Sequence, residues 1–483
     1  MQKYTFQGLG LFAFLWIALM GCEKDRVISA SDSLAFSIDT LFFDTVFTEV
    51  GTATRNFKVY NRSNQTLRIE SIRFERSNSP FRFNIDGETG TSVENLELLP
   101  GDSAFVFVEA TINPNGGNLP LVVEENLVFQ FGNGQRNMPI VAWGQDANYI
   151  RADTRVTGLP PYKILPPNAV WTANKPYVIY GYAVVDSANS LQIEAGTKVY
   201  FHSGSGLWVF RYGQIAVRGT KEQPVVFQGD RLEPQYQDIP GQWDRIWINE
   251  GPAGRDNLIE HAVVKNALVG IQLETLPFSY NLNAPTSENK TTIRNTRIQN
   301  CSALALFLRN YRVDASNCVV VNGGQYAIGI SGGGEYQFNH ITAGNYASVV
   351  GRKTPAFFMT NAYEAEPGVV QVRSITNSRF TNCIFSGIER NEFDFDLNNL
   401  APNQVVFDHC LIKSEKTFSS TLVVESYFNQ NPGFTDVGAF NFKPTANAFI
   451  RGKGKGGIET ADIDLNPRNI DTPDLGAFEY KPD

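Results

Sequence analysis

Three carboxylates stand at alternate positions in the segment GIERNEFDFDLNN, residues 387–399, namely Glu392, Asp394 and Asp396. In a β-strand, alternate residues point to the same face, so these side chains are expected to lie side by side. Carboxylate oxygens are the ligands that Ca²⁺ prefers. The segment therefore predicts a calcium site, with a solvated acidic loop as the alternative, because neighbouring carboxylates repel one another unless water or a cation separates them.

Cleavage of acidic polysaccharides is the enzymatic activity against which the rest of the chain can be tested. A lyase acting on uronates needs a cation to neutralise the substrate carboxylate and a Lys or Arg as the base. A hydrolase needs two carboxylates at a defined separation. Between residues 257 and 385 the acidic residues are scattered, with no Asp-x-Asp or Asp-Asp pair. The sequence therefore predicts no catalytic residue, and no cofactor other than the candidate Ca²⁺.

Two tryptophans in the segment GQWDRIW, Trp243 and Trp247, are candidates for stacking on sugar rings. The alternative is structural, because a longer insertion at 231–242 precedes them and large rings can close the side of a fold. Three of the four histidines stand in or near strand-like runs, but residues stacked in a row do not converge as tetrahedral zinc ligands must. Zinc is therefore not expected.

Asparagines recur at equal intervals in the middle of the chain. Asn295, Asn317 and Asn339 are separated by 22 residues each, and each precedes a short apolar run. A fixed period of this length without helix-length amphipathic segments is typical of a solenoid of β coils. Equivalent residues of stacked coils lie above one another, so these amides are predicted to point inward and form a structural ladder. Asn377 and Asp408 are expected to be later, less regular rungs.

The elements that must carry these residues are short strands. Residues 148–425 contain three- to five-residue apolar runs separated by Gly turns, which predicts a parallel β-helix. Residues 426–483 are predicted to form a cap over its last coil, since an open end of a parallel sheet exposes unpaired backbone. Residues 36–147 contain about seven alternating strands, typical of an immunoglobulin-like β-sandwich without a disulfide. The fold class is therefore all-β.

The N-terminus reads as an export signal. Residues 1–21 include the apolar run LGLFAFLWIALMG, which is short for a membrane span and typical of a signal peptide. The ending LMGC resembles a bacterial lipobox, which makes Cys22 the expected lipidation site. Residues 23–26, EKDR, resemble the charged export tag of surface lipoproteins in Bacteroidota-type bacteria. A polar tether is predicted over 22–35, and lipid chains on Cys22 would hold the protein at a membrane.

Two family resemblances add to this interpretation. The stretch 170–415 resembles the right-handed parallel β-helix proteins of the pectate-lyase-like superfamily, and the final D-x-GA-x-E segment is similar to the endings of such proteins. The stretch before it resembles Ig-like domains related to the ASPM/SPD-2/Hydin group. The combination resembles a surface lipoprotein of the outer membrane, which is the localisation that we expect.

The expected function is binding without catalysis. We expect a scaffold or accessory subunit of an envelope complex that binds an outer-membrane protein partner through the predicted loops 275–290, 353–371 and 388–403. The alternative is a polysaccharide-binding protein or a Ca²⁺-dependent polysaccharide lyase at the cell surface. The net charge of −8, without a long basic stretch, argues against nucleic acid as a partner.

Overall fold

The computed structural model describes residues 27–47, 51, 54–112, 121–250, 255–275, 287, 289–347 and 352–482. The predicted signal peptide, Cys22 and most of the predicted loop 275–290 lie outside this part of the chain. The chain forms two compact units, residues 1–146 and 147–483, and both are built from β-strands. Across the described residues, no helix is long and apolar enough to cross a membrane.

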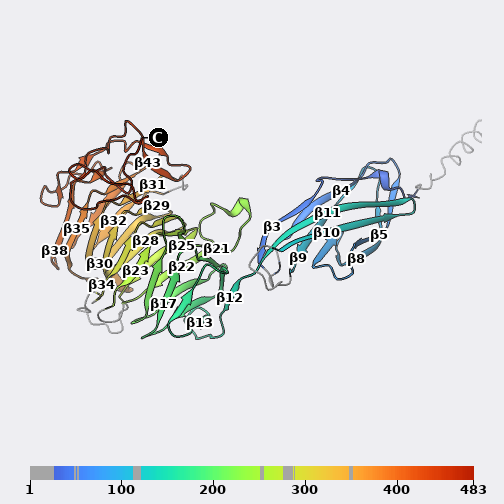
Figure 1. Cartoon of the computed structure of the whole chain (residues 1–483), viewed down its shortest axis with the longest axis horizontal. Helices are drawn as coiled ribbons and strands as arrows, with labels where there is room; N and C mark the ends of the chain where they lie inside the picture. Colours follow the sequence, from blue (N-terminus) through green and yellow to red (C-terminus); the bar gives the residue numbers. More distant parts are fainter. Residues whose placement is uncertain are drawn as a thin grey trace, which may run out of the picture. The chain divides into compact units, whose positions relative to one another are not determined.

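The first unit is a sandwich of two β-sheets (Figure 1). Its elements are β1 (Val27–Ile28), the 3₁₀ turn η1 (Ser31–Ser33), β2 (Leu34–Phe36), β3 (Leu41–Phe47), β4 (Arg55–Asn61), β5 (Thr66–Phe74), β6 (Phe81–Ile85), β7 (Glu88–Gly90), β8 (Ser92–Leu98), β9 (Ser103–Ala110), β10 (Leu121–Phe131) and β11 (Gly134–Gln145). One sheet has the order β1-β5-β10-β11-β3 with β8 beside β5, and the other has the order β2-β4-β9-β6-β7. Alternate residues such as Val106 and Val108 are buried, so the core lies between the sheets. The sandwich agrees with the predicted architecture, and its relation to Ig-like domains stays a prediction.

The sandwich begins earlier than the sequence pattern indicates. Residues 22–35 are predicted to be a tether, but β1 pairs with β5 and β2 pairs with β4. Leu34 is 1% exposed and belongs to the hydrophobic core. A two-residue strand such as β1 has no recognisable alternation, which is why the pattern missed it.

The second unit is a parallel β-helix built from two large sheets. An 11-stranded sheet contains, in spatial order, β12 (Asn148–Arg151), β15 (Tyr177–Tyr180), β18 (Lys198–Phe201), β21 (Val225–Gly229), β24 (Ala262–Lys265), β27 (Arg297–Cys301), β29 (Val319–Gly323), β31 (Thr342–Asn345), β36 (Ile384–Gly387), β39 (Leu411–Ile412) and β41 (Tyr427–Phe428). Each coil contributes one strand to this sheet and one or two strands to the other sheet, so the predicted β-helix is confirmed.

The second large sheet has 17 short strands, which are stacked one after another along the unit (Figure 1). They are β13 (Tyr162–Ile164), β14 (Ala169–Trp171), β16 (Tyr182–Val185), β17 (Ser190–Glu194), β19 (Gly206–Val209), β20 (Gln214–Arg218), β22 (Trp243–Ile248), β23 (Asn257–Glu260), β25 (Ala267–Glu274), β26 (Thr291–Arg294), β28 (Leu304–Ser316), β30 (Tyr326–Asn339), β32 (Phe357–Thr360), β35 (Ile375–Thr381), β37 (Phe393–Asp396), β38 (Asn403–Asp408) and β40 (Val423–Val424). The remaining elements are a 3₁₀ turn and two short hairpins, namely η2 (Pro234–Tyr236), β33 (Ala362–Glu366) with β34 (Val369–Val372), and β42 (Phe434–Asp436) with β43 (Asn441–Pro444).

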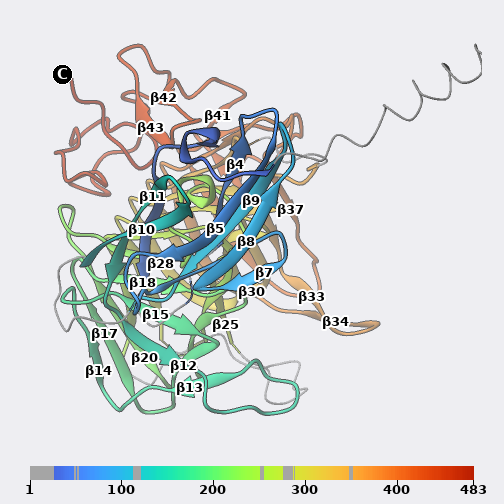
Figure 2. The same ribbon diagram turned by 90° about the vertical axis from the view of Figure 1, so that its right-hand side faces the viewer.

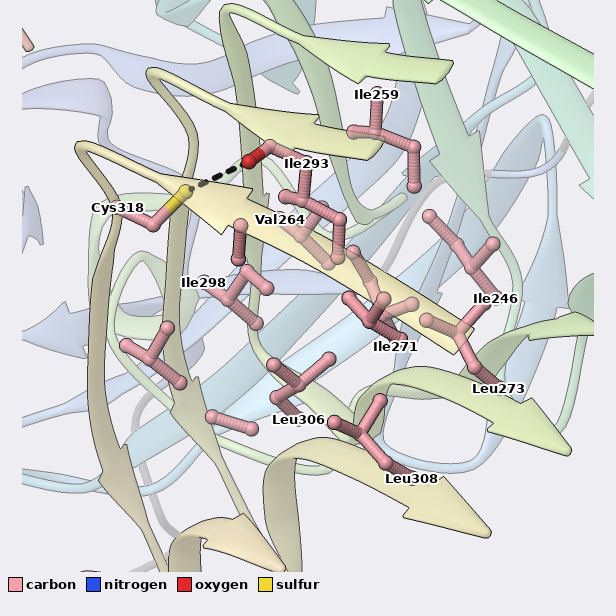
Figure 3. Close-up of a cluster of buried hydrophobic side chains, with 14 of the residues drawn as sticks. Ile246, Ile259, Val264, Ile271, Leu273, Ile293, Ile298, Leu306, Leu308 and Cys318 are labelled. Carbon is pink, nitrogen blue, oxygen red and sulfur yellow. Dashed lines mark hydrogen bonds between the residues drawn. The ribbon is translucent and has the colours of Figure 1, made fainter. Parts of the chain in front are cut away.

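In-register stacking places equivalent side chains in rows inside the coils. Ile193 pairs with Val217, and the row continues coil by coil with Ile259, Ile293 and Ala315. Figure 3 shows the aliphatic part of this core, where the Cys318 thiol donates to the Ile293 carbonyl at 3.5 Å. The row continues with aromatic side chains, Phe338, Phe380 and Phe407, which are at most 1% exposed, and then reaches Val423. Burial of apolar side chains along these rows is the main contribution to the folding stability of the β-helix.

A row of corner residues follows the 17-stranded sheet, and all its members have φ between 43° and 57°. They are His261, Asn295, Asn317, His340, Asn382, His409 and Glu425. Each backbone N–H except that of Glu425 donates to a carbonyl of the next coil, for example Asn317 N–H to Asn339 O at 3.1 Å. Asn is among the residues that adopt this left-handed conformation most readily. The corner is therefore an architectural position.

The predicted ladder needs three corrections. His340 and not Asn339 occupies the corner, because Asn339 is the last residue of β30 and pairs with Ser316. The proposed later rungs Asn377 and Asp408 are likewise replaced by Asn382 and His409. The side chains also do not form one inward ladder, since Asn295 bonds to His261 at 3.2 Å whereas Asn317 bonds to the C-terminal segment. That segment lies outside the coils.

The C-terminal segment, predicted as a cap over 426–483, packs beside the coils rather than over the open end of the last coil. It packs on the outer face of the 11-stranded sheet, where Phe442 and Phe478 contact Val319 and Val321 (dark red in Figure 1, beside β29 and β31). The core at the last coil is instead covered by Phe418, whose ring lies 5.3 Å from those of Phe393 and Phe395. An outward apolar row on β29 needs cover, and the C-terminal segment supplies it.

Candidate functional site

The predicted calcium ligands do not converge. Glu392 is 0% exposed and forms a two-point ion pair with Arg352, with N–O distances of 2.7 and 3.0 Å. Asp394 pairs with Lys416 at 2.6 Å, and Asp396 is exposed. Burial raises the pKa of the Glu392 carboxyl, whereas the hydrogen bond from Arg352 lowers it. Two of the three carboxylates therefore belong to separate ion pairs, and the third faces solvent. They do not form a shared cation site.

One group of described residues could offer three metal ligands within 4.8 Å, namely Asp408, His409 and Glu425. Asp408 already bonds to His409 at 2.7 Å, to Arg379 at 2.7 Å and to Lys455 at 2.9 Å. Burial raises the pKa of Asp408, but the hydrogen bonds from His409 and Lys455 outweigh it and hold that pKa below its usual value. Two cations on one carboxylate compensate its charge, so this group is a salt-bridge network.

The structure buries one candidate tryptophan and stacks a ring face of the other on a neighbouring tryptophan. Trp243 is 1% exposed, stacks on Phe201 at 4.1 Å and donates to the Lys265 carbonyl inside the coil. Trp247 faces outward but stacks on Trp208 at 4.7 Å, and its indole N–H donates to Glu274 at 2.8 Å. The structural alternative therefore accounts for Trp243, and Trp247 belongs to an outer aromatic row.

The C-terminal segment is anchored by a buried arginine. The Arg468 side chain is 0% exposed and donates to Asn317 Oδ1 at 2.9 Å, to Gly476 O at 2.9 Å and to Glu479 at 3.3 Å. The segment DLGAFE supplies the last two of these acceptors. Gly476 has φ +82°, and a Cβ there would lie 2.5 Å from Thr342 Oγ1, so glycine is required. The DLGAFE segment thus holds Arg468 against Asn317 of the corner row.

His340 lies beside this anchor, and its side chain is buried. Its Nε2 accepts from Asn382 at 3.0 Å, whereas its buried Nδ1 has no hydrogen-bond partner. Burial and then the nearby Arg468 guanidinium hold the pKa of His340 well below 6.5, opposed by the Gly476 and Asp474 backbone. A protonated His340 would therefore place a second buried cation next to the first.

We predict an acid-sensitive anchor from this geometry. Because the folded-state pKa of His340 lies below the unfolded-state value near 6.5, the unfolded state binds more protons at acidic pH. The contribution of His340 to the free energy of unfolding should be constant above pH 6.5 and fall by up to about 1.4 kcal/mol per pH unit below it. His340→Asn should make this slope shallower, since Asn occupies the same corner in neighbouring coils and does not titrate. Denaturant titrations at stepped pH test this, and an unchanged slope in the variant contradicts it.

Two predicted insertion loops form one protruding surface. The hairpin β33–β34 projects from the β-helix in Figure 2, and Asn361 at its base exchanges two hydrogen bonds of 2.8 Å with Asn398 in the second loop. Each of the two loops carries exposed apolar side chains: Val369 is 44% and Val370 59% exposed on the hairpin, and Leu400 is 84% exposed on the second loop. We call residues 361–372 with 397–401 the hairpin surface.

A shallow groove of about 490 Å³ lies on the outer face of the last coils of the 17-stranded sheet. Its polar lining consists of amides, two hydroxyls and one cation, namely Gln337, Asn377, Asn403, Gln404, Ser378, Thr421 and Arg379. The Arg379 side chain is half exposed and also bonds to Asp408. The groove can donate and accept hydrogen bonds, but its described lining contains no pair of carboxylates.

The sequence patterns did not indicate two buried arginines, Arg468 and Arg352. Arg468 donates a hydrogen bond to Asn317, which stands 151 positions earlier in the chain. Arg352 pairs with Glu392, which stands 40 positions later. Neither Arg stands in a motif of its own. The D-x-GA-x-E segment, which supplies the Gly476 and Glu479 acceptors, was the available signal for Arg468.

Comparison with known proteins supports the architecture. The model of the pectate-lyase like beta helix domain matches residues 163–250. A search of curated proteins gives no match. A solved structure described as the Vibrio cholerae VesB protease is similar over 24% of this chain at 13% identity, with a TM-score of 0.17, which carries no argument. The chain covers 32% of that structure's length. Its β-helix is similar to the pectate-lyase-like domain, a fold that fits a polysaccharide-related or a protein-interaction role.

Proposed function

We propose that this protein is a non-catalytic scaffold whose β-helix binds a protein partner through the hairpin surface. The observation that carries the proposal is that two insertions are hydrogen-bonded to each other and both expose apolar side chains, Val369 and Val370 on one and Leu400 on the other. Exposed apolar side chains gathered on one feature favour a protein contact over solvent. The hydrogen bonds between Asn361 and Asn398 hold the patch in one shape, which lowers the entropic cost of binding.

The charged groups near the candidate sites support binding over catalysis. A lyase base or a hydrolase carboxylate must be available to the substrate. Glu392 is sequestered by Arg352, and Asp408 is compensated by Arg379 and Lys455. Glu274, which faces the outer aromatic row, is paired with Arg309 at 3.4 Å. Compensated charges of this kind stabilise a rigid surface.

The location of the scaffold forms part of the same proposal. A lipid on Cys22 would anchor the chain at the outer membrane, and the partner would then be an outer-membrane protein of an envelope complex. The support is the apolar run followed by LMGC and the charged residues 23–26. Replacing Cys22 with Ser should release the protein from the membrane fraction, whereas retention of the variant would contradict the lipid anchor.

Affinity purification from detergent-solubilised envelopes tests the protein partner. The wild-type chain should recover one stoichiometric protein, and Leu400→Asp should reduce the recovery at least tenfold, because a charge is placed in the apolar patch. Val170→Asp is the matched control, since Val170 is 51% exposed on β14, outside the hairpin surface. Equal recovery with both variants, or no stoichiometric protein, would contradict the proposal.

Polysaccharide binding in the amide-lined groove is the second candidate function. Amides and an Arg side chain suit sugar hydroxyls and carboxylates, and the groove is open to solvent. Incubation of the chain with uronate polymers, with and without Ca²⁺, separates the possibilities. Binding that is weakened at least tenfold by Arg379→Ala would favour this candidate, and unsaturated products would identify a lyase instead.

A further inference from the structure

The hairpin β33–β34 presents an unprotected strand edge. β34 pairs with β33 along one side, and its other side pairs with no strand in the described part of the chain. Natural proteins usually protect such edges with Lys, Pro or a bulge on the edge itself. β34 reads Val-Val-Gln-Val and contains neither Lys nor Pro, and the bulge in this hairpin lies between Glu364 and Glu366 on β33. Among the described residues, this edge of β34 is therefore left without a partner strand.

The inner face of the hairpin is fixed to the β-helix. Tyr363 lies over Gly332, where a Cβ would be 2.6 Å from its ring. Gln371 is 3% exposed and accepts from Tyr363 at 2.6 Å and from Arg373 at 2.8 Å. Val370 precedes Gln371 and points to the opposite face, which leaves it 59% exposed. The edge is therefore presented in a defined orientation.

The charge of the hairpin selects the kind of partner. Residues 362–372 include Glu364 and Glu366 and contain no Lys or Arg. Both glutamates are exposed, and Glu364 stands directly opposite Val370 in the hairpin register. A partner strand with Lys or Arg side chains would be attracted to this edge, and an acidic strand would be repelled.

We propose that β34 binds an extended, Lys- or Arg-containing segment of the partner protein as a third strand of the hairpin. This inference rests on the proposed protein-binding function and names the chemistry of the partner. Backbone hydrogen bonds along the edge supply the affinity, and alternate side chains supply the specificity. A third strand also stabilises a two-stranded hairpin, which is marginal by itself in water.

Fluorescence anisotropy with the purified full chain and a labelled eight-residue peptide that alternates Lys and Val tests the inference. We expect saturable binding that is at least tenfold weaker for the same peptide with N-methyl groups on alternate amides, since these cannot pair along one edge. A peptide alternating Glu and Val should also bind at least tenfold more weakly. Equal binding of the parent and N-methylated peptides, or no binding of the parent, would overturn the proposal.

Variants of the chain locate the binding edge. Val370→Lys should weaken peptide binding at least tenfold, because a charge on the edge strand repels the basic peptide. Val170→Lys should leave binding unchanged. Glu364→Gln combined with Glu366→Gln should weaken binding and reduce its dependence on salt. An unaltered affinity in Val370→Lys would overturn the proposal.

The outcomes also separate strand addition from protein binding in general. If Leu400→Asp abolishes partner recovery but the peptide does not bind, the strand-addition inference is wrong and the proposed function stands. If the peptide binds as expected and the envelopes contain no partner, β34 can accept an added strand but the proposed function is wrong.

Discussion

Arg468→Ala is expected to destabilise the docked C-terminal segment by about 3 to 5 kcal/mol, because its partners lose a buried cation with several hydrogen bonds. Asn317 Oδ1 and the Gly476 carbonyl would be left buried without that donor. The expected result is rapid proteolytic cleavage within residues 426–482 while the coils persist. Denaturant unfolding and limited proteolysis measure the two effects.

A conservative replacement and a matched control sharpen this prediction. Arg468→Lys should also destabilise, since a single ammonium cannot reproduce the planar donor arrangement that reaches Asn317, Gly476 and Glu479. Arg218→Ala, at an exposed position, should change the free energy of unfolding by no more than about 0.5 kcal/mol. An Arg468→Ala variant as stable and as protease-resistant as the control would show that the anchor is misassigned.

The second large effect is expected at the buried ion pair of Arg352 and Glu392. Both side chains are at most 1% exposed, so Arg352→Met leaves a buried carboxylate without its cation. Breaking such a pair from one side costs about 3 to 5 kcal/mol, whereas replacing both partners by apolar residues is often neutral. Arg352→Met with Glu392→Leu should therefore recover most of the stability. A double-mutant cycle from denaturant unfolding measures the coupling.

Asp394→Asn is the control for this cycle. Its partner Lys416 is half exposed, and exposed pairs contribute about 0 to 1 kcal/mol. Calcium should leave the unfolding midpoint of the wild-type chain unchanged, since bound ligand would raise it. A calcium-dependent rise that Glu392→Gln or Asp394→Asn abolishes would restore the calcium site predicted from the sequence.

The coarse architecture follows from local sequence features, but the register does not. Short apolar runs and Gly turns predict the parallel β-helix, and Asn295 and Asn317 do occupy the predicted corner. The next corner is His340 because that coil is longer by one residue than the preceding one. Extrapolating an equal interval therefore gave Asn339, and a shift of one residue moves a side chain to a different face.

The acidic segment shows why the candidate site was only partly predictable. Alternation holds for Asp394 and Asp396, which share a face of β37. Glu392 stands immediately before that strand, where the chain turns inward, so the period of two does not extend to it. Its partner Arg352 comes from an insertion of the preceding coil. Contacts of this kind depend on how coils stack, and a period in the sequence does not encode them.

Site-specific photo-cross-linking in intact cells tests the central claim most directly, because it asks what contacts the hairpin surface in place. A photoreactive phenylalanine analogue at Val370 should give one dominant protein adduct, and the same analogue at Val170 should give none. Adducts of equal yield at both positions, or no protein adduct at Val370, would contradict a scaffold that binds its partner through the hairpin.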